Sequence, residues 1–175
     1  NTNEIKYLKI DGTIQFSIVL DNEIYFSSES GFFKLLNGQS ELLINNSIIS
    51  SNVINVFNQN DGLLLLSSRD GFYTLSNDGY VSKKKSYLDS NVNFSIFSSL
   101  KLNDDSFVLG TIGQGIVLLN SDLQFNSKID KSKGLINNTV LSIFQDFESN
   151  IWLGLDNGIS VINSKSPFKI FNDDN

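Results

Sequence analysis

Four glycines at nearly equal intervals constrain this chain more than any other feature of its sequence. Gly31, Gly71, Gly115 and Gly158 lie 40, 44 and 43 residues apart. Each glycine follows a short apolar run and a few polar residues, and a second apolar run begins directly after it. A glycine in such a turn adopts positive φ without steric cost, so each position predicts a tight hairpin. A four-stranded repeat of about 40–50 residues is typical of the blades of a β-propeller.

The clearest copy of the repeat is residues 137–163, NNTVLSIFQDFESNIWLGLDNGISVIN. Three apolar and β-branched runs, Val140–Phe144, Ile151–Leu155 and Ile159–Ile162, are predicted to be strands. A fourth strand is predicted at Phe168–Phe171. Short strands joined by tight polar turns predict one antiparallel meander.

Residues 53–75 repeat this pattern without a gap. The ungapped comparison places Phe57 on Phe144 and Leu65 on Trp152. The remaining two copies are looser, but they keep the hairpin glycine between apolar runs. We therefore predict an all-β fold made of four-stranded antiparallel blades.

The repeat divides the chain into four predicted blades after a short opening segment. Residues 1–12 are predicted to be the outer strand of a preceding blade. The four blades are predicted at residues 13–45, 46–88, 89–133 and 134–175. We expect this set to be part of a larger propeller; a closed four-bladed ring and two copies that complete one ring are the alternatives. Because the flat faces of two end blades would be apolar and uncovered, we also expect self-association.

Composition supports this fold and excludes several functions. Alanine is absent and proline occurs once, so little or no helix is expected. The formal net charge of −6 disfavours nucleic acid and acidic membrane surfaces as partners. The basic run Lys83–Lys85 is interpreted as a solvated outer edge that discourages strand pairing. No apolar run is long enough to cross a membrane.

The absence of histidine and cysteine leaves little catalytic chemistry. It excludes Ser-His-Asp and Cys-His nucleophiles, thiolate chemistry and imidazole metal sites. Acidic side chains between first and second strands are interpreted as turn caps; they are Asp61, Asp104, Asp105, Asp146 and Glu148. We predict no catalytic residue, no metal and no cofactor, and hence no enzyme. A propeller glycosidase or lyase is the least favoured alternative, because it needs two carboxylates about 5–9 Å apart in a pocket.

A candidate binding face follows from the predicted turns. In a propeller, the turn into each first strand and the hairpin between the second and third strands open on one face. The polar residues at these positions are Asn45, Asn46, Arg69, Asp70, Asn91, Gln114, Asn137, Asn138, Asp156 and Asn157. Amides with few charges suit a hydroxyl-rich ligand, and loops on a rigid scaffold often carry binding residues. The alternative is that tight turns simply use these residues.

Trp152 has two interpretations as well. A tryptophan can be a stacking platform for a sugar ring. Because Leu65 takes its place in the earlier copy, packing between blades is the favoured interpretation.

Residues 135–146 and 151–159 closely resemble the two-component regulator propeller repeat. That repeat has an Asn-rich turn, then V-x-x-I-x-x-D, then a W-[IL]-G-T-x-x-G-[LI] core. The fourth blade carries the match, whereas the first three lack the tryptophan and mostly the glycine before the hairpin.

The resemblance implies a sensory input domain in a periplasmic location. Members of the family are large bacterial signalling proteins, commonly with a β-sandwich, a membrane helix and a histidine kinase or DNA-binding output. Many are associated with carbohydrate sensing. The expected partners are an oligosaccharide and the other blades and β-sandwich of the same receptor; a scaffold that dimerises the receptor without a ligand is the alternative.

Overall fold

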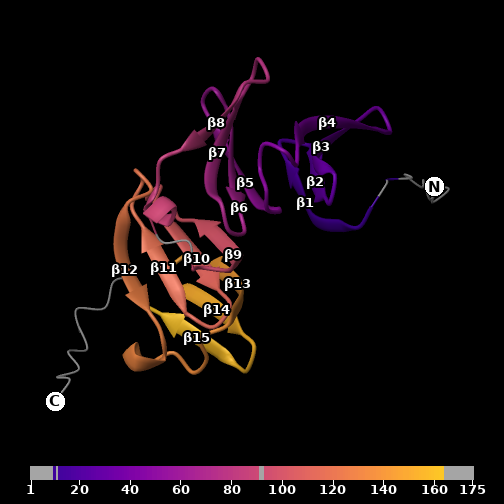
Figure 1. The fold of residues 1–175 in the computed structure, drawn as a ribbon. Coiled ribbons are helices and arrows are strands. Elements are labelled where there is room, and N and C mark those ends of the chain that lie inside the picture. The colour runs from indigo at the N-terminus through magenta and orange to yellow at the C-terminus, as the bar shows by residue number, and fades with distance from the viewer. Residues whose placement is uncertain (1–9, 11, 91–92, 164–175) are drawn as a thin grey trace. The chain divides into compact units, whose positions relative to one another are not determined.

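The computed structural model describes residues 10, 12–90 and 93–163, and it is built almost entirely of β-strands (Figure 1). The strands form four antiparallel sheets, in each of which neighbouring strands follow one another along the chain. Two short 3-10 helices, Tyr87–Ser90 and Lys131–Lys133, are the helical elements of the described residues. The all-β fold of propeller blades predicted from the sequence is confirmed. Among the described residues, none of the helices has the length and apolar character that crossing a membrane requires.

The four sheets are named here in chain order. The first contains β1 (Ile14–Leu20), β2 (Glu23–Ser28), β3 (Gly31–Leu36) and β4 (Gln39–Asn45). The second contains β5 (Val53–Gln59), β6 (Gly62–Ser67), β7 (Gly71–Ser76) and β8 (Val81–Lys84). The third contains β9 (Ile96–Lys101), β10 (Phe107–Thr111), β11 (Ile116–Leu119) and β12 (Phe125–Ile129).

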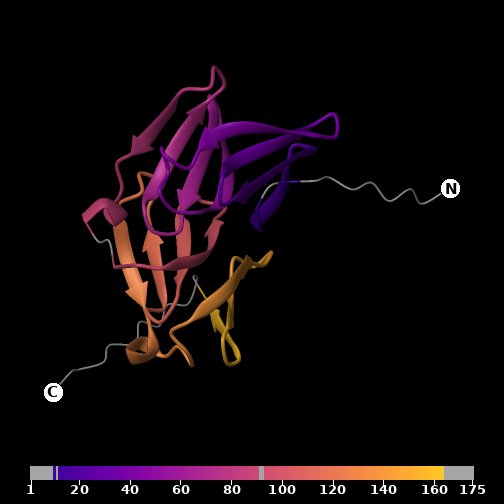
Figure 2. The same cartoon turned by 45° about the vertical axis from the view of Figure 1, so that its right-hand side comes forward.

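The fourth sheet has three strands in the described part of the chain. They are β13 (Val140–Gln145), β14 (Ile151–Leu155) and β15 (Ile159–Ile162). The fourth strand predicted at Phe168–Phe171 and the outer strand predicted within residues 1–12 lie outside the described strands and, apart from Ile10 and Gly12, outside the described residues. Figure 2 shows the meander of each sheet from a second side.

The chain divides into two compact units, residues 1–83 and 84–175. In the first unit β1 lies beside β5, and in the second unit β9 lies beside β13. Each pair of sheets therefore packs face to face around an apolar core. Tyr25, Phe32, Val56 and Leu65 are central to the first core. Val108, Val140, Ile151 and Leu153 are central to the second core, together with the half-buried Leu100 and Leu118.

The first strand of every sheet contains a β-bulge, which gives a common reference position for comparing the four sheets. The register shifts directly after Ile14, Val53, Ile96 and Val140. The extra residue bends the strand and increases its local twist. These four residues are thus equivalent, and the strand pairing from each of them fixes the equivalent positions in the rest of its sheet.

This alignment corrects one equivalence inferred from the sequence. Phe144 pairs with Trp152, whereas Phe57 pairs with Leu64 and not with Leu65. Four residues separate Asn58 from its partner Leu63, whereas five separate the equivalent pair Gln145 and Ile151. In the next hairpin the second sheet has one residue more, with five between Leu66 and Phe72 and four between Gly154 and Ile159. An ungapped comparison therefore misplaces β6 by one residue, which exchanges the two faces of the strand. Leu64 is the counterpart of Trp152, and Leu65 belongs to the opposite face.

Candidate functional site

A cavity of about 270 Å³ lies between the first and second sheets, inside the first unit. The turn between β2 and β3 and the link from β4 to β5 enclose it. Phe32, Ile44, Ile49 and Val53 line its floor, and all four are buried. The exposed side chains of Asn45, Asn46, Ser50 and Asn52 line its mouth. An apolar floor with a few convergent polar groups is typical of a small-molecule site.

Hydrogen bonds hold the mouth of this cavity in place. The Asn45 Oδ1 accepts a bond from the Ser47 amide at 2.9 Å, as an Asx turn does. The Asn46 Nδ2 donates to the Glu29 carbonyl at 2.8 Å, which ties the link to the β2–β3 turn. Among the described residues no hydrogen bond to the Asn46 Oδ1 is found, and this amide oxygen is an acceptor that suits a ligand hydroxyl.

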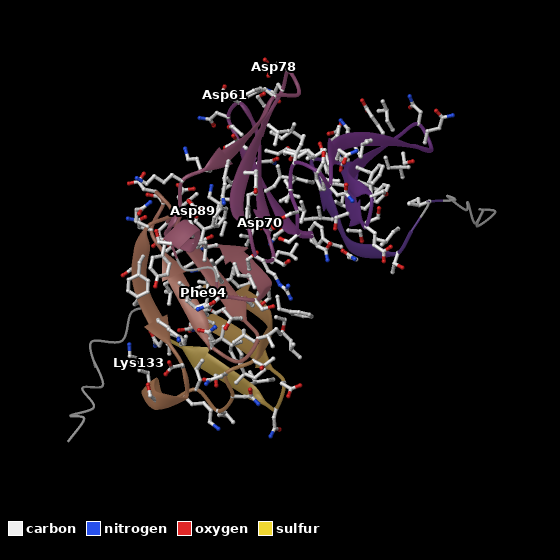
Figure 3. All side chains as sticks on the ribbon, in the orientation of Figure 1. Asp61, Asp70, Asp78, Asp89, Phe94 and Lys133 are labelled. Atoms are coloured by element: carbon white, nitrogen blue, oxygen red, sulfur yellow. The ribbon has the colours of Figure 1, made fainter. Side chains whose placement is uncertain are left out.

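The turn between β6 and β7 supports the same mouth from the second sheet. The Ser50 hydroxyl donates to Asp70 Oδ2 at 2.7 Å, and the Arg69 amide donates to Ser51 Oγ at 3.2 Å. Figure 3 shows Asp70 at the end of the second sheet opposite to Asp61 and Asp78. Of the predicted site residues, Asn45 and Asn46 therefore line this cavity. Arg69 and Asp70 do not line it but are bonded to two of its lining serines.

The predicted site residues of the second unit lie where the third and fourth sheets meet. The Gln114 Nε2 donates to the Asn93 carbonyl at 2.8 Å. The Asn138 carbonyl accepts from the Gly115 amide at 2.6 Å, and the Asp156 amide donates to the Thr139 carbonyl at 3.0 Å.

Two asparagines in the segment between β12 and β13 also accept hydrogen bonds from backbone amides. Asn137 Oδ1 accepts from the Thr139 amide at 2.8 Å, and Asn138 Oδ1 accepts from the Lys131 amide at 2.7 Å. Asn157 is exposed in the β14–β15 turn. Asn91 lies outside the described residues. Most of these polar groups thus help to build turns, and their role toward a ligand stays a prediction.

Sequence reasoning missed the serines of the first site. Ser27 and Ser28 are buried, Ser51 is half-buried, and all three line the cavity. The Ser27 hydroxyl donates to the Val53 carbonyl at 2.8 Å, and so joins the two sheets. The signal was present as paired serines in SSES, residues 27–30, and in IISSN, residues 48–52.

A second cavity, of about 390 Å³, lies elsewhere in the first unit and brings two carboxylates together. Glu23 forms an ion pair with Lys34 at 2.6 Å and accepts a bond from the Tyr25 hydroxyl at 2.6 Å. These bonds, first the one from Lys34 and then the one from Tyr25, lower the pKa of Glu23. Asp21 accepts a bond from Asn58 Nδ2 at 2.7 Å.

This arrangement does not suit glycoside hydrolysis. A glycosidase needs a carboxylic acid with a raised pKa as proton donor. Glu23 instead stays ionised beside its lysine. Burial, followed by the hydrogen bond to Glu23, raises the pKa of Tyr25 far above its usual value, so the phenol stays protonated and is a poor base.

Other carboxylates cap turns, as the sequence predicted for Asp104 and Asp146. Asp104 accepts bonds from the amide and the hydroxyl of Ser106, and the hydroxyl bond comes first in lowering its pKa. Asp146 Oδ2 accepts from Trp152 Nε1 at 2.8 Å and from Asn150 Nδ2 at 2.9 Å. These two bonds, led by that from Trp152, lower the pKa of Asp146. Within the described residues, no group of three or more acidic side chains is placed to hold a metal ion.

Comparison with solved structures identifies the kind of protein that this chain resembles. The extracellular domain of BT4673 from B. thetaiotaomicron has been solved twice, described once as a hybrid two component system and once as a one component system. It is 24% and 25% identical in the two structures, with a TM-score of 0.64 over 85% of this chain. The extracellular domain of the hybrid two component system BT3049 from the same organism is 18% identical, with a TM-score of 0.71 over 95% of this chain.

The chain spans about a fifth of each of these domains, 21% for BT4673 and 23% for BT3049. It also matches 99% of the computationally designed Ika4 protein, with 12% identity and a TM-score of 0.63 over 91% of this chain. No family model matches the chain, and no curated protein matches its sequence. The solved structures confirm the resemblance to the two-component regulator propeller family and agree with the predicted extracytoplasmic location.

Proposed function

We propose that this chain is a segment of the sensory propeller of an extracytoplasmic, two-component-type receptor. The similarity to extracellular domains of such systems is the observation that carries the proposal. Its partners are the remaining blades and the β-sandwich of the same receptor, in the periplasm. The segment itself is an input module without catalytic activity, and a histidine kinase output lies elsewhere in the receptor.

The ligand that we propose is a carbohydrate bound in the cavity between the first two sheets. The mouth offers amide and hydroxyl groups from Asn46 and Ser50, and two carboxylates lie nearby, Glu29 in the lining and Asp70 bonded to Ser50. Such groups bond to sugar hydroxyls, and the apolar floor covers the C–H face of a ring. The cavity of about 270 Å³ is of the size for the end unit of an oligosaccharide rather than for a long chain. Binding acts by favouring one of two arrangements of the receptor.

Thermal unfolding with a panel of oligosaccharides tests this proposal. A ligand at 100 times its Kd stabilises the folded chain by about 2.7 kcal/mol. For a chain of this size each kcal/mol raises the Tm by about 2–4 °C. We therefore expect a clear rise in Tm with at least one glycan.

A matched pair of variants tests whether the ligand binds in this cavity. Ser50→Phe fills the mouth of the cavity and should abolish the rise in Tm. Ser47→Phe makes the same change on the same exposed link but away from the cavity lining, and should leave the rise unchanged. Equal rises in both variants would reject this cavity as the site.

A non-binding scaffold is the second candidate function. The internal hydrogen bonds of Asn45, Gln114, Asn137 and Asn138 favour it, because turn structure alone accounts for these side chains. A panel that leaves the Tm of wild type unchanged would support the scaffold.

A further inference from the structure

The second cavity of the first unit, of about 390 Å³, is separate from the proposed carbohydrate site, and the two linings have no residue in common. It lies between the first and second sheets beside the β1–β2, β5–β6 and β7–β8 turns, whereas the first cavity lies beside the β2–β3 turn. Figure 3 shows Asp61 and Asp78, from two of these turns, at the end of the second sheet opposite to Asp70. All the lining residues belong to the unit of residues 1–83, so the cavity is defined within one compact unit.

The charges around this cavity favour a cation. Among the described residues that line it, Asp21 and Glu23 are acidic and Lys34 alone is basic. Asp61 and Asp78 lie in the adjoining turns and add negative charge at the same end of the second sheet. Uncompensated negative charge in a recess between two sheets raises the local concentration of cations.

Lys34 shows how the wall of this cavity holds an ammonium group. Its Nζ lies 2.6 Å from Glu23 Oε1 and 5.8 Å from the centre of the Tyr25 ring. Carboxylates and aromatic faces both attract ammonium groups. The Tyr25 side chain is only 7% exposed, and its hydroxyl donates to the second oxygen of Glu23 at 2.6 Å. Because Glu23 is fully engaged by these two partners, the carboxylate left for an incoming cation is Asp21.

Asp21 carries a charge that no lysine or arginine among the described residues neutralises. Its Oδ2 accepts a hydrogen bond from Asn58 Nδ2 at 2.7 Å, and within the same residues its Oδ1 has no partner. Burial first, then the hydrogen bond and the charge of Glu23, and last the charge of Asp21 raise the pKa of Tyr25. The two carboxylates therefore act on one buried phenol, which places Asp21 at the same recess as Glu23.

Apolar side chains from both sheets provide a surface for an alkyl chain. Leu43 comes from the first sheet, and Leu63 and Leu75 come from the second. Leu75 is buried in the first core, and Leu43 and Leu63 are half-buried against it. A hydrated metal ion would gain nothing from these leucines, whereas an organic cation buries its carbon chain on them. The volume of the cavity is within the range of about 300–1,000 Å³ that is common for small-molecule sites.

We propose that this cavity binds a small primary alkylammonium ion, with the ammonium group at Asp21 and the alkyl chain on Leu43, Leu63 and Leu75. Asn58 and Asn77 also line the cavity, and amide oxygens accept hydrogen bonds from the other N–H groups of an ammonium. The site is independent of the proposed carbohydrate function, so either can fail without the other.

A titration with n-butylammonium chloride, followed by the backbone amide chemical shifts of the whole chain at pH 7 and constant ionic strength, tests this site. We expect saturable shifts at residues 21–25, 58–63 and 75–77, with residues 27–31 and 44–53 unaffected. Butan-1-ol, which has the same chain without the charge, should bind at least about tenfold more weakly. Methylammonium, which has the charge without the chain, should also bind more weakly than n-butylammonium.

Three outcomes of this titration would overturn the proposal. Equal affinities for n-butylammonium and butan-1-ol would remove the role of the charge. Equal affinities for n-butylammonium and methylammonium would remove the role of the leucines. Shifts that do not saturate, or that leave residues 21–25 unaffected, would show that the cation does not bind in this cavity.

Asp21→Asn tests the carboxylate on which the proposal depends. Asp21 and Asn22 have positive φ values of 50° and 62°, which asparagine also adopts, so the variant keeps the turn. Its amide oxygen can still accept from Asn58, and yet the Kd for n-butylammonium should rise about tenfold or more. Asp61→Asn removes the same charge from an adjoining turn outside the lining and should change the Kd by less than about twofold. Equal changes in the two variants would show that the cation is attracted by net charge and not by a site at Asp21.

Discussion

Paired glycine and serine residues decide how closely the third and fourth sheets pack. A Cβ on Gly110 would collide with Ser98 Oγ and lie 2.9 Å from Val140 Cγ1 in the next sheet. A Cβ on Gly154 would meet only Ser142, whose exposed side chain can turn away. The same residue pair is therefore constrained by a neighbouring sheet in one case and not in the other.

Gly110→Ala should lower the free energy of unfolding by about 1–3 kcal/mol, because an overpacked site strains its neighbours. The change also displaces the Ser98 hydroxyl from the Val140 carbonyl. Gly154→Ala is the matched control and should lower the free energy of unfolding by clearly less. Urea unfolding measures both, and equal losses would show that the collision with Val140 has no effect.

The carboxylates in the turns should make the stability of the folded chain depend on pH in the acidic range. In four turns, a side-chain hydrogen bond is the leading cause that lowers the pKa of an aspartate. The pairs are Ser76 with Asp78, Ser106 with Asp104, Ser132 with Asp130, and Trp152 with Asp146. A lowered folded-state pKa stabilises the fold above the unfolded value of 3.8, and this stabilisation is lost as the pH falls through the folded value.

The Tm should accordingly be flat near neutral pH and fall as the pH drops below about 4. Asp146→Asn should make that fall shallower, since one of the four carboxylates no longer titrates. Thermal unfolding across the pH range checks this, with Asp156→Asn, at an exposed turn carboxylate, as the control. Identical slopes for wild type and Asp146→Asn would be inconsistent with the role given to Asp146.

At the scale of the element, each strand has one face toward its own unit's core. Leu65 in β6 is fully buried in the first core, whereas Val19 in β1 is largely exposed. Leu65→Ala should destabilise the chain by about 2–5 kcal/mol, because it leaves a cavity. Val19→Ala should change the stability by no more than about 0.5 kcal/mol. Denaturant unfolding compares the two, and a small loss for Leu65→Ala would contradict its place in the core.

The strands and hairpins could be predicted from the sequence, but the exact register of β6 could not. Hairpin glycines and apolar runs indicate strands because their physical cause is local. The turns before and after β6 differ in length by compensating amounts, so Gly71 still lies at the expected spacing while Leu64 and Leu65 exchange faces. Only the bulge at Val53 and the cross-strand pairs reveal this.

At the scale of the whole molecule, the candidate site was only partly predictable. Asn45 and Asn46 were found because turn amides are visible in the sequence. The buried floor at Phe32 and Val53 comes from two different sheets, so its formation depends on tertiary packing. The site therefore combines a local signal with a contact between distant parts of the first unit.

Amide chemical shifts during a glycan titration report directly on whether a hydroxyl-rich ligand binds between the first two sheets. We predict that a glycan which raises the Tm shifts the backbone amides of residues 27–31 and 44–53. The indole N–H of Trp152 should stay unchanged at a protein concentration that is held constant. Shifts centred on the Trp152 indole, with residues 44–53 unaffected, would contradict the account and assign the ligand to the exposed face of the fourth sheet.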